Sequence, residues 1–103
     1  MKSILHSKAA RTCYLCAVLH EDFRERRDLE EHHVFGGNPN RKLSERYGLK
    51  VYLCQEHHRT GDEAVHRPDK NDNQKRLQAA AQEAFERWYP DVSFREVFGK
   101  NYR

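Results

Sequence analysis

Three cysteines and one histidine form two pairs with the same spacing. Cys13 and Cys16 make a CxxC pair, and Cys54 and His57 are also separated by two residues. Tetrahedral zinc takes four thiolate or imidazole ligands, usually from two turns whose side chains converge. A helical turn places residues i and i+3 on one face, which suits Cys54 and His57. The sequence therefore predicts one structural zinc site. The alternative is three buried thiols with His57 beside them by chance.

Other histidines remain once His57 is assigned to zinc. His32 and His33 are consecutive, and His58 follows His57 directly. Successive helical residues differ by about 100°, so His58 can face a second site. One imidazole can bind a divalent cation, and another, neutral near pH 7, can take a proton from water. Strand neighbours point to opposite faces. His32 and His33 therefore share a site only if the chain bends at the following glycine pair; otherwise one is a surface or core histidine.

The elements that must position these groups are short. Residues 31–35 are expected to form a short strand, and residues 49–53 have the β-branched and aromatic character of a second one. Between them, consecutive Gly, Asn and Pro at 36–40 predict a loop, and residues 42–47 can form one helical turn. The stretch from Cys54 to Gly61 is compatible with a helix. We therefore expect a strand, a loop, a second strand and a helix that carries the last histidines.

The second half of the chain predicts two supporting helices. A helix over 72–89 is expected to bury an apolar stripe, and Asn71 to Asn73 can cap its start. Ser93 and Glu96 form a capping-box pattern for a short terminal helix that Gly99 ends. In the terminal helix Phe94, Val97 and Phe98 share a face. The stripe of the long helix consists of Leu77, Ala80, Ala81, Ala84, Phe85 and Trp88.

Length and composition fit one small α+β domain. The chain has 103 residues, of which 37% are hydrophobic and 34% charged, with a net charge of +3. A domain this small gains from a metal, because metal binding energy adds to folding energy. Residues 1–12 are expected to be a loose basic lead-in, and residues 13–103 a single domain with a metal-built core at 13–60 and supporting segments at 61–103. In the charged stretch 21–30, Phe23 and Leu29 are the only apolar anchors.

Composition also excludes several classes of protein. No apolar stretch approaches the roughly 20 residues of a membrane span. The 11% of aromatic residues argues against a disordered chain. The first ten residues have an apolar run too short for an export signal. We therefore expect the reducing cytoplasm, where clustered cysteines more often bind metal than form disulfides.

The order of these motifs resembles the HNH endonucleases of the ββα-metal, or His-Me finger, superfamily. The resemblance covers about residues 13–58: CxxC, a histidine pair before an apolar residue and a Gly-Gly loop, then LCxxHH. It implies a zinc-stabilised ββα-metal fold and a metal-dependent DNA endonuclease. From Gly61 onward, including Val65-His66 and EVFGKNY, the chain resembles small phage and prophage HNH proteins related to a RecA-dependent phage nuclease.

The resemblance also implies roles for the histidines. His33 matches the general base that activates water. His32 matches the preceding metal ligand, often Asp in the family, and His58 matches the final ligand of the catalytic cation. Because both ligands are imidazoles, we expect Mn²⁺ or Ni²⁺ to support activity more readily than Mg²⁺. The implied ligands of the structural zinc (Zn²⁺) are Cys13, Cys16 and Cys54, with His57 in place of the family's usual fourth cysteine.

Two further catalytic candidates come from the family pattern. The family's central asparagine falls here on Leu49, which cannot replace it. Asn40 is the preferred substitute, because Arg41 follows it, and Asn38 is the other. His66 is a further candidate because it lies shortly after the motif helix.

The implied partner is DNA, not a membrane, and the implied setting is a bacterial host cell, in phage or host recombination or packaging. A non-catalytic zinc module that binds nucleic acid or protein is the alternative, and an RNA-cleaving enzyme also stays open. Side chains that contact phosphates position the substrate without reading its sequence. The candidates are Arg41, Lys42, Arg46, Arg59 and Arg67.

Overall fold

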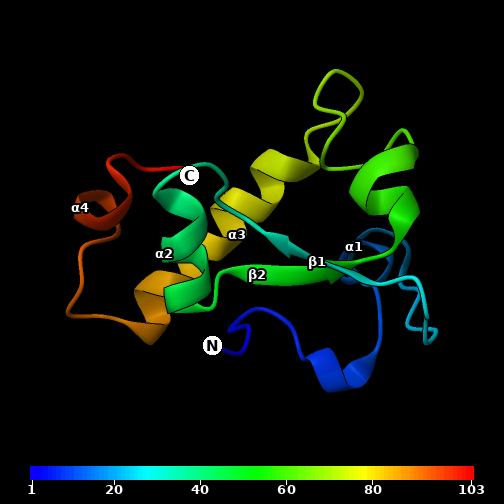
Figure 1. Ribbon diagram of the computed structural model, residues 1–103, viewed down its shortest axis with the longest axis horizontal. Coiled ribbons are helices and arrows are strands. Elements are labelled where there is room, and N and C mark those ends of the chain that lie inside the picture. The colour runs from blue at the N-terminus through cyan, green and yellow to red at the C-terminus, as the bar shows by residue number, and fades with distance from the viewer.

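The computed structural model describes all residues, 1–103, and has an α+β fold built on one two-stranded antiparallel sheet. In Figure 1 the hairpin crosses the molecule, with α2 and α4 toward one end and α1 toward the other. No helix combines the length and the apolar character needed to cross a bilayer. The elements, in chain order, are η1 (Lys8–Ala10), α1 (Tyr14–His20), β1 (Glu30–His33), α2 (Asn40–Tyr47), β2 (Lys50–Leu53), the π-helical turn η2 (Glu56–Thr60), α3 (Asn73–Trp88) and α4 (Phe94–Phe98).

The sheet pairs β1 with β2 over four residues. His32 lies opposite Val51, and His33 lies opposite Lys50. β1 ends two residues earlier than the predicted strand 31–35, because the chain turns at this point to contact α2. There the Phe35 amide donates to Ser44 Oγ, which donates in turn to the Phe35 carbonyl. The extra residues of the predicted strand are buried in the core instead.

The core joins the hairpin to α3 and α4 through aromatic rings. Phe35 is fully buried and packs against Phe94, Phe98 and Tyr102, with ring centroids 4.7–5.4 Å apart. Aromatic pairs at these separations are favourable beyond their buried area. Phe85 of α3 packs on the same cluster. The two C-terminal helices therefore support the back of the hairpin, as predicted.

Two predicted core residues are on the surface. Trp88, at the end of α3, is 60% exposed, because the helix ends there and the chain turns at Tyr89 and Pro90. Phe23 is 68% exposed and anchors nothing, whereas Leu29 packs against the core. Both helix starts are near their predicted positions. Asn71 Oδ1 accepts from the Asn73 amide at the start of α3, and Ser93 Oγ accepts from the Glu96 amide at the start of α4.

The N-terminal segment (residues 2–11) packs on the sheet and is not the loose lead-in that composition suggested. It covers the edge of β2 that β1 leaves free: Ser3 Oγ donates to the Lys50 carbonyl, and the Tyr52 amide donates to His6 Nδ1 at 3.3 Å. The Ile4 amide donates to the Gly48 carbonyl at 2.9 Å. Gly48 has φ +74°, and a Cβ there would collide with the Lys2 carbonyl. Glycine at this position therefore permits both the helix cap and the close approach of the segment.

Candidate metal centres

The two predicted ligand pairs converge into one buried cluster. Cys13 caps the start of α1 and Cys16 lies in its first turn, whereas Cys54 follows β2 and His57 belongs to η2. The four side chains are buried, and the cysteines are free thiols. His57 Nδ1 lies 3.3 Å from the sulfurs of Cys16 and Cys54 and 3.8 Å from that of Cys13. The four residues are therefore positioned to bind a metal such as zinc.

These separations fit a tetrahedral ion. Zinc bonds of about 2.3 Å to sulfur and 2.0 Å to nitrogen separate the ligand atoms by roughly 3.5–3.8 Å. The Cys16 and Cys54 sulfurs are 3.9 Å apart, too far for a disulfide. In the metal-free chain, burial and the neighbouring thiols raise the pKa of Cys16 to about 12, and burial also raises the pKa of Cys54. Metal binding must therefore release protons from these thiols.

Charged side chains surround this cluster. His57 Nε2 donates to Glu63 at 3.0 Å, and His20 Nε2 contacts the same oxygen at 2.7 Å. Such a carboxylate fixes the tautomer of a ligating histidine and leaves Nδ1 free to bind the ion. Hydrogen bonds to the two histidines lower the pKa of Glu63. On the other side, Arg26 Nη1 donates to the Cys16 sulfur at 3.8 Å. Its positive charge offsets the net negative charge that three thiolates would give a divalent ion.

A second cluster consists of His32, His58 and His66, whose ligand nitrogens lie within 4.8 Å of one another. His32 and His58 are buried, whereas His66 is exposed. His58 Nε2 lies 3.0 Å from His66 Nε2, close to the separation of two imidazole nitrogens that bind one ion. His66, a candidate from the family pattern alone, thus joins the two histidines that were predicted as cation ligands.

Hydrogen bonds fix the tautomers of two of these rings. His58 Nδ1 donates to Glu30 at 2.8 Å, which leaves the Nε2 lone pair facing His66. Gln74 Nε2 donates to the Val34 carbonyl, so its Oε1 accepts from His32 Nε2 at 2.8 Å, and Nδ1 of His32 keeps its lone pair. Metal-binding histidines in proteins have such partners on their other nitrogen.

The electrostatics of this cluster favours a neutral imidazole at His32 and at His66. Burial lowers the pKa of His32 to about 4, and it also lowers the pKa of His66, with help from the nearby Arg59. The hydrogen bond with His58 lowers the pKa of Glu30, and Arg59 adds to this effect through an ion pair at 3.2 Å. The His32 and His66 rings therefore have lone pairs available to a cation at pH 7.

His33 lies on the opposite face of β1 from His32, as strand alternation requires, and no bulge brings the two rings together. Its Nε2 donates to Glu45 of α2 at 2.9 Å and lies 3.4 Å from Glu31. Lys50 donates to both Glu45 oxygens, at 3.0 and 3.1 Å. The Met1 ammonium, His33 and Lys50 together lower the pKa of Glu45 to about 2.

A cavity of about 460 Å³ nonetheless joins the two faces, because no strand covers the other edge of β1. It is lined by all three residues of the His32/His58/His66 cluster, by His33 and by Arg41 and Arg59. The cavity thus combines lone pairs for a cation, a histidine from the other face of β1 and two guanidinium groups. This is a suitable site for a small anion such as a phosphodiester.

The structure does not bring the other predicted side chains to this cavity. Asn40 begins α2, and no hydrogen bond joins its side chain to His33; Glu45 makes that contact instead. Lys42 and Arg46 are exposed on α2, and Arg67 lies beside Asp62 at 3.9 Å. None of these four lines the cavity.

Sequence reasoning missed the acidic partners of the histidines. Glu30, Glu45 and Glu63 each accept from a histidine of one of the sites. Glu30 could have been found by strand alternation, because it lies on the same face of β1 as His32. Glu45 and Glu63 gave no signal of this kind, since ordinary surface glutamates have the same local sequence context.

No protein-family model matches the chain, and no curated protein or solved structure is significantly similar to it.

Proposed function

We propose that this protein is a metal-dependent DNA endonuclease with the ββα-metal arrangement of the HNH enzymes. The observation that carries the proposal is the cavity in which three imidazoles converge beside a fourth histidine and two arginines. The order β1, α2, β2 and η2 supports it, because a hairpin and the helical turn after it supply His32, His33 and His58. The Cys13/Cys16/Cys54/His57 cluster then has the structural role.

In this proposal His33 takes the proton from the attacking water. Its Nε2 hydrogen is held by Glu45, so Nδ1 is the nitrogen with the free lone pair. A carboxylate that orients a histidine in this way also stabilises the imidazolium that forms. Glu45 therefore orients His33, whereas Asn40, the preferred substitute for the family's central asparagine, makes no hydrogen bond with it.

The remaining residues of the cavity would hold the phosphate and the cation. His32, His58 and His66 would hold one divalent ion, which supplies Lewis-acid stabilisation of the developing charge. Arg41 and Arg59 would position the scissile phosphate through charge-assisted hydrogen bonds. Three imidazoles and no carboxylate favour Mn²⁺ or Ni²⁺ over Mg²⁺.

The test is cleavage of supercoiled plasmid DNA by the purified chain with Mn²⁺, Ni²⁺, Mg²⁺ or no added metal. Wild type should convert the plasmid to nicked or linear forms with Mn²⁺. His33→Ala should lose at least a hundredfold of the rate, with zinc content unchanged and the chain still folded. His20→Ala is the matched control, because His20 contacts Glu63 and the His57 ring beside the other cluster and does not line the cavity.

Full activity of His33→Ala would contradict the assigned base. A folded, zinc-loaded wild type that binds DNA and cleaves neither DNA nor RNA with any of these ions would contradict the endonuclease. That result would favour the non-catalytic zinc module.

A further inference from the structure

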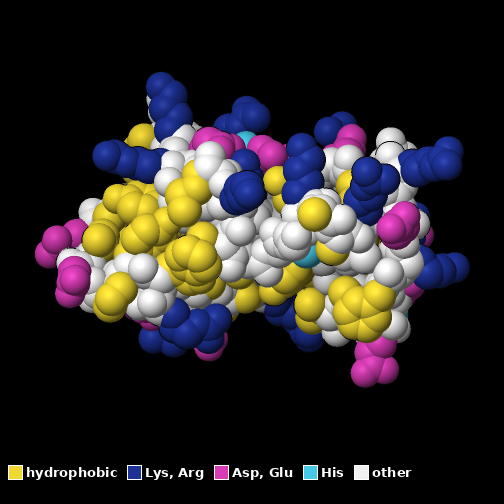
Figure 2. Space-filling model, turned by 90° about the horizontal axis from the view of Figure 1, so that it is seen from below, with side chains coloured by type: hydrophobic (Ala, Val, Ile, Leu, Met, Phe, Trp, Pro, Cys, Tyr) yellow, Lys and Arg dark blue, Asp and Glu magenta, His cyan; other side chains and the backbone are white.

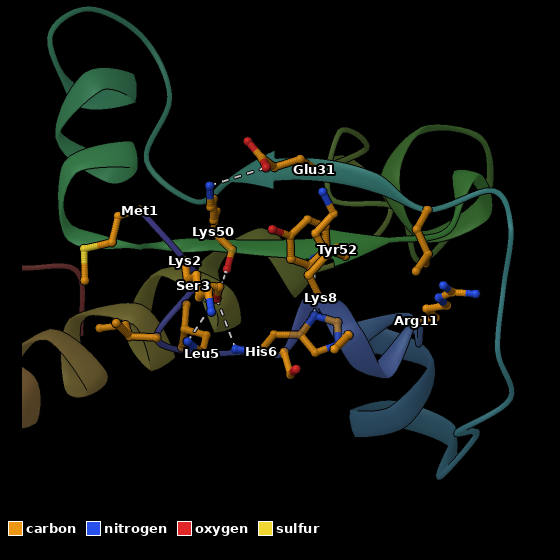
Figure 3. Close-up of a pocket in the computed structure, with 14 residues that line it drawn as sticks. Met1, Lys2, Ser3, Leu5, His6, Lys8, Arg11, Glu31, Lys50 and Tyr52 are labelled. Carbon is orange, nitrogen blue, oxygen red and sulfur yellow. Dashed lines mark hydrogen bonds and ion pairs between the residues drawn. The ribbon is translucent and has the colours of Figure 1, made fainter.

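A second and larger cavity lies between the N-terminal segment and the sheet. Its volume is about 1210 Å³, and its apolar lining includes Ile4, Leu5 and Leu29. Figure 3 shows the segment running below β2, with the side chains of both around the hollow. None of the residues assigned to the two metal centres lines this cavity.

The charge of this cavity is strongly positive. Lys2, Lys8 and Arg11 line it, are exposed, and form no ion pair within the chain. The one carboxylate of the lining, Glu31, is paired with Lys50 at 3.4 Å. Figure 2, seen from the side of the N-terminal segment, shows Lys and Arg side chains across the middle and right of this face. Unpaired cations around a concave surface concentrate a field that attracts anions.

This cavity begins next to the proposed catalytic histidine. A single atom, Glu45 Oε1, accepts from Lys50 at 3.0 Å and from His33 at 2.9 Å. Lys50 lines the larger cavity and His33 the smaller one, while Glu31 lines both. A chain of phosphates with one member beside His33 could therefore continue along the N-terminal segment.

We infer that the cavity between the N-terminal segment and the sheet binds a single strand of nucleic acid adjoining the scissile phosphate, an inference that rests on the proposed function. The phosphates would contact Lys2, Lys8 and Arg11, and the apolar lining would take sugars and bases. A positively charged groove with aromatic side chains on which bases stack is the usual way to hold a single strand without sequence preference, and His6 and Tyr52 line this cavity. A duplex is instead read by elements that protrude into its grooves, and this surface is hollow.

The experiment measures binding of fluorescein-labelled dT12 by fluorescence anisotropy. It uses the zinc-loaded full chain with no added divalent cation, so that no strand is cut. Removal of two phosphate contacts in Lys8→Ala/Arg11→Ala should raise Kd roughly 10- to 30-fold at 0.1 M salt. The slope of log K against log salt should fall by about 1.4, from about 0.7 for each contact with a single strand.

The matched control is Arg95→Ala/Lys100→Ala, which removes the same charges from exposed positions in and after α4. Its Kd should stay within twofold of wild type, and both double variants should keep the wild-type melting temperature. As a second measurement, independent of the variants, a dT12 strand carrying 4-thiothymidine should cross-link to peptides from residues 2–11 of the wild-type chain.

Three results would overturn the inference: an unchanged Kd in Lys8→Ala/Arg11→Ala, an equal loss in the control, or an equal loss when the ligand is a 12-base-pair duplex. These outcomes are separate from the proposed function. If dT12 binding depends on Lys8 and Arg11 but no nucleic acid is cleaved, the proposed nuclease is contradicted and the single-strand site is supported. Plasmid cleavage, together with dT12 binding that is the same with and without Lys8 and Arg11, would support the nuclease and contradict the strand site.

Discussion

His57 and His58 are neighbours in the chain, yet their rings belong to different clusters. His57 Nδ1 faces the sulfurs of Cys16 and Cys54 at 3.3 Å, while His58 Nε2 faces His66 at 3.0 Å. Both lie in one π-helical turn, and π-helical turns are frequent at functional sites. Because both rings are carried by this one turn, a shift of its backbone would move a side chain of each cluster.

Loss of a zinc ligand is expected to unfold much of the domain. Cys54→Ser should bind well under one zinc per chain and melt at least 10 °C lower, because metal binding contributes directly to folding. Metal analysis and circular dichroism melts check this. Val18→Ser, at an exposed position of α1, is the control and should behave as wild type. Full zinc content and an unchanged melt in Cys54→Ser would contradict the assigned ligand set.

The His32/His58/His66 cluster is expected to bind one Mn²⁺ per chain, more weakly than the zinc is bound. His66→Ala removes one of three ligands and should weaken Mn²⁺ binding at least tenfold in a titration followed by electron paramagnetic resonance. Because His66 is exposed, the variant should fold normally. His20→Ala, which alters no residue of this cluster, should bind Mn²⁺ as wild type does. Equal Mn²⁺ affinity in the two variants would show that His66 is not a ligand.

Acid should destabilise the protein partly through Glu45. The Met1 ammonium, His33 and Lys50 hold the pKa of Glu45 at about 2, below its ordinary value of 4.5. A depressed pKa contributes stability that is present above the unfolded value and is lost as pH falls through the folded one. The free energy of unfolding should therefore decrease between about pH 4.5 and 2.

Urea unfolding at a series of pH values measures this contribution. Glu45→Gln should flatten the acid side of the stability curve, whereas Glu25→Gln, at an exposed position without an ion pair, should leave it as in wild type. If Glu45→Gln kept the full acid dependence, the contribution of this carboxylate to stability would be refuted.

Alanine substitutions at two glycines should distinguish the cost of backbone strain from the cost of a steric collision. Gly37 and Gly48 both have positive φ, +80° and +74°. A Cβ at Gly37 meets nothing within 4 Å, but at Gly48 it collides with the Lys2 carbonyl. Gly37→Ala should cost about 1 kcal/mol and Gly48→Ala about 2 kcal/mol or more. Urea midpoints check the difference, and equal costs would mean that the N-terminal segment moves aside freely.

Features set by local spacing could be predicted from the sequence. The Cys13/Cys16 and Cys54/His57 pairs each lie within one turn, so their spacing predicted the cluster that the structure contains. The same holds for Ser93, whose hydroxyl caps α4 as expected. The α+β class also followed from local patterns, whereas the ββα-metal assignment remains a prediction.

Features that depend on distant pairing could not be predicted. His33 meets Glu45 from twelve residues away, and His58 meets Glu30 from twenty-eight residues away. Such contacts depend on how β1 packs against α2 and against η2, which local sequence patterns do not encode. Trp88 matched the periodicity of α3 but lies where the helix ends, so periodicity alone assigned it wrongly to the core.

The contacts of Ser3 and His6 with β2 have a consequence for how copies of this protein meet. These side chains occupy the Lys50 carbonyl and the Tyr52 amide, which would otherwise form an open edge. Without them, the free edge of β2 would have two unpaired backbone groups, the Lys50 carbonyl and the Tyr52 amide. Strand-to-strand pairing between molecules is the common fate of such an edge. The first defect of a chain with a displaced N-terminal segment would therefore be self-association, before any loss of the core around the Cys13/Cys16/Cys54/His57 cluster.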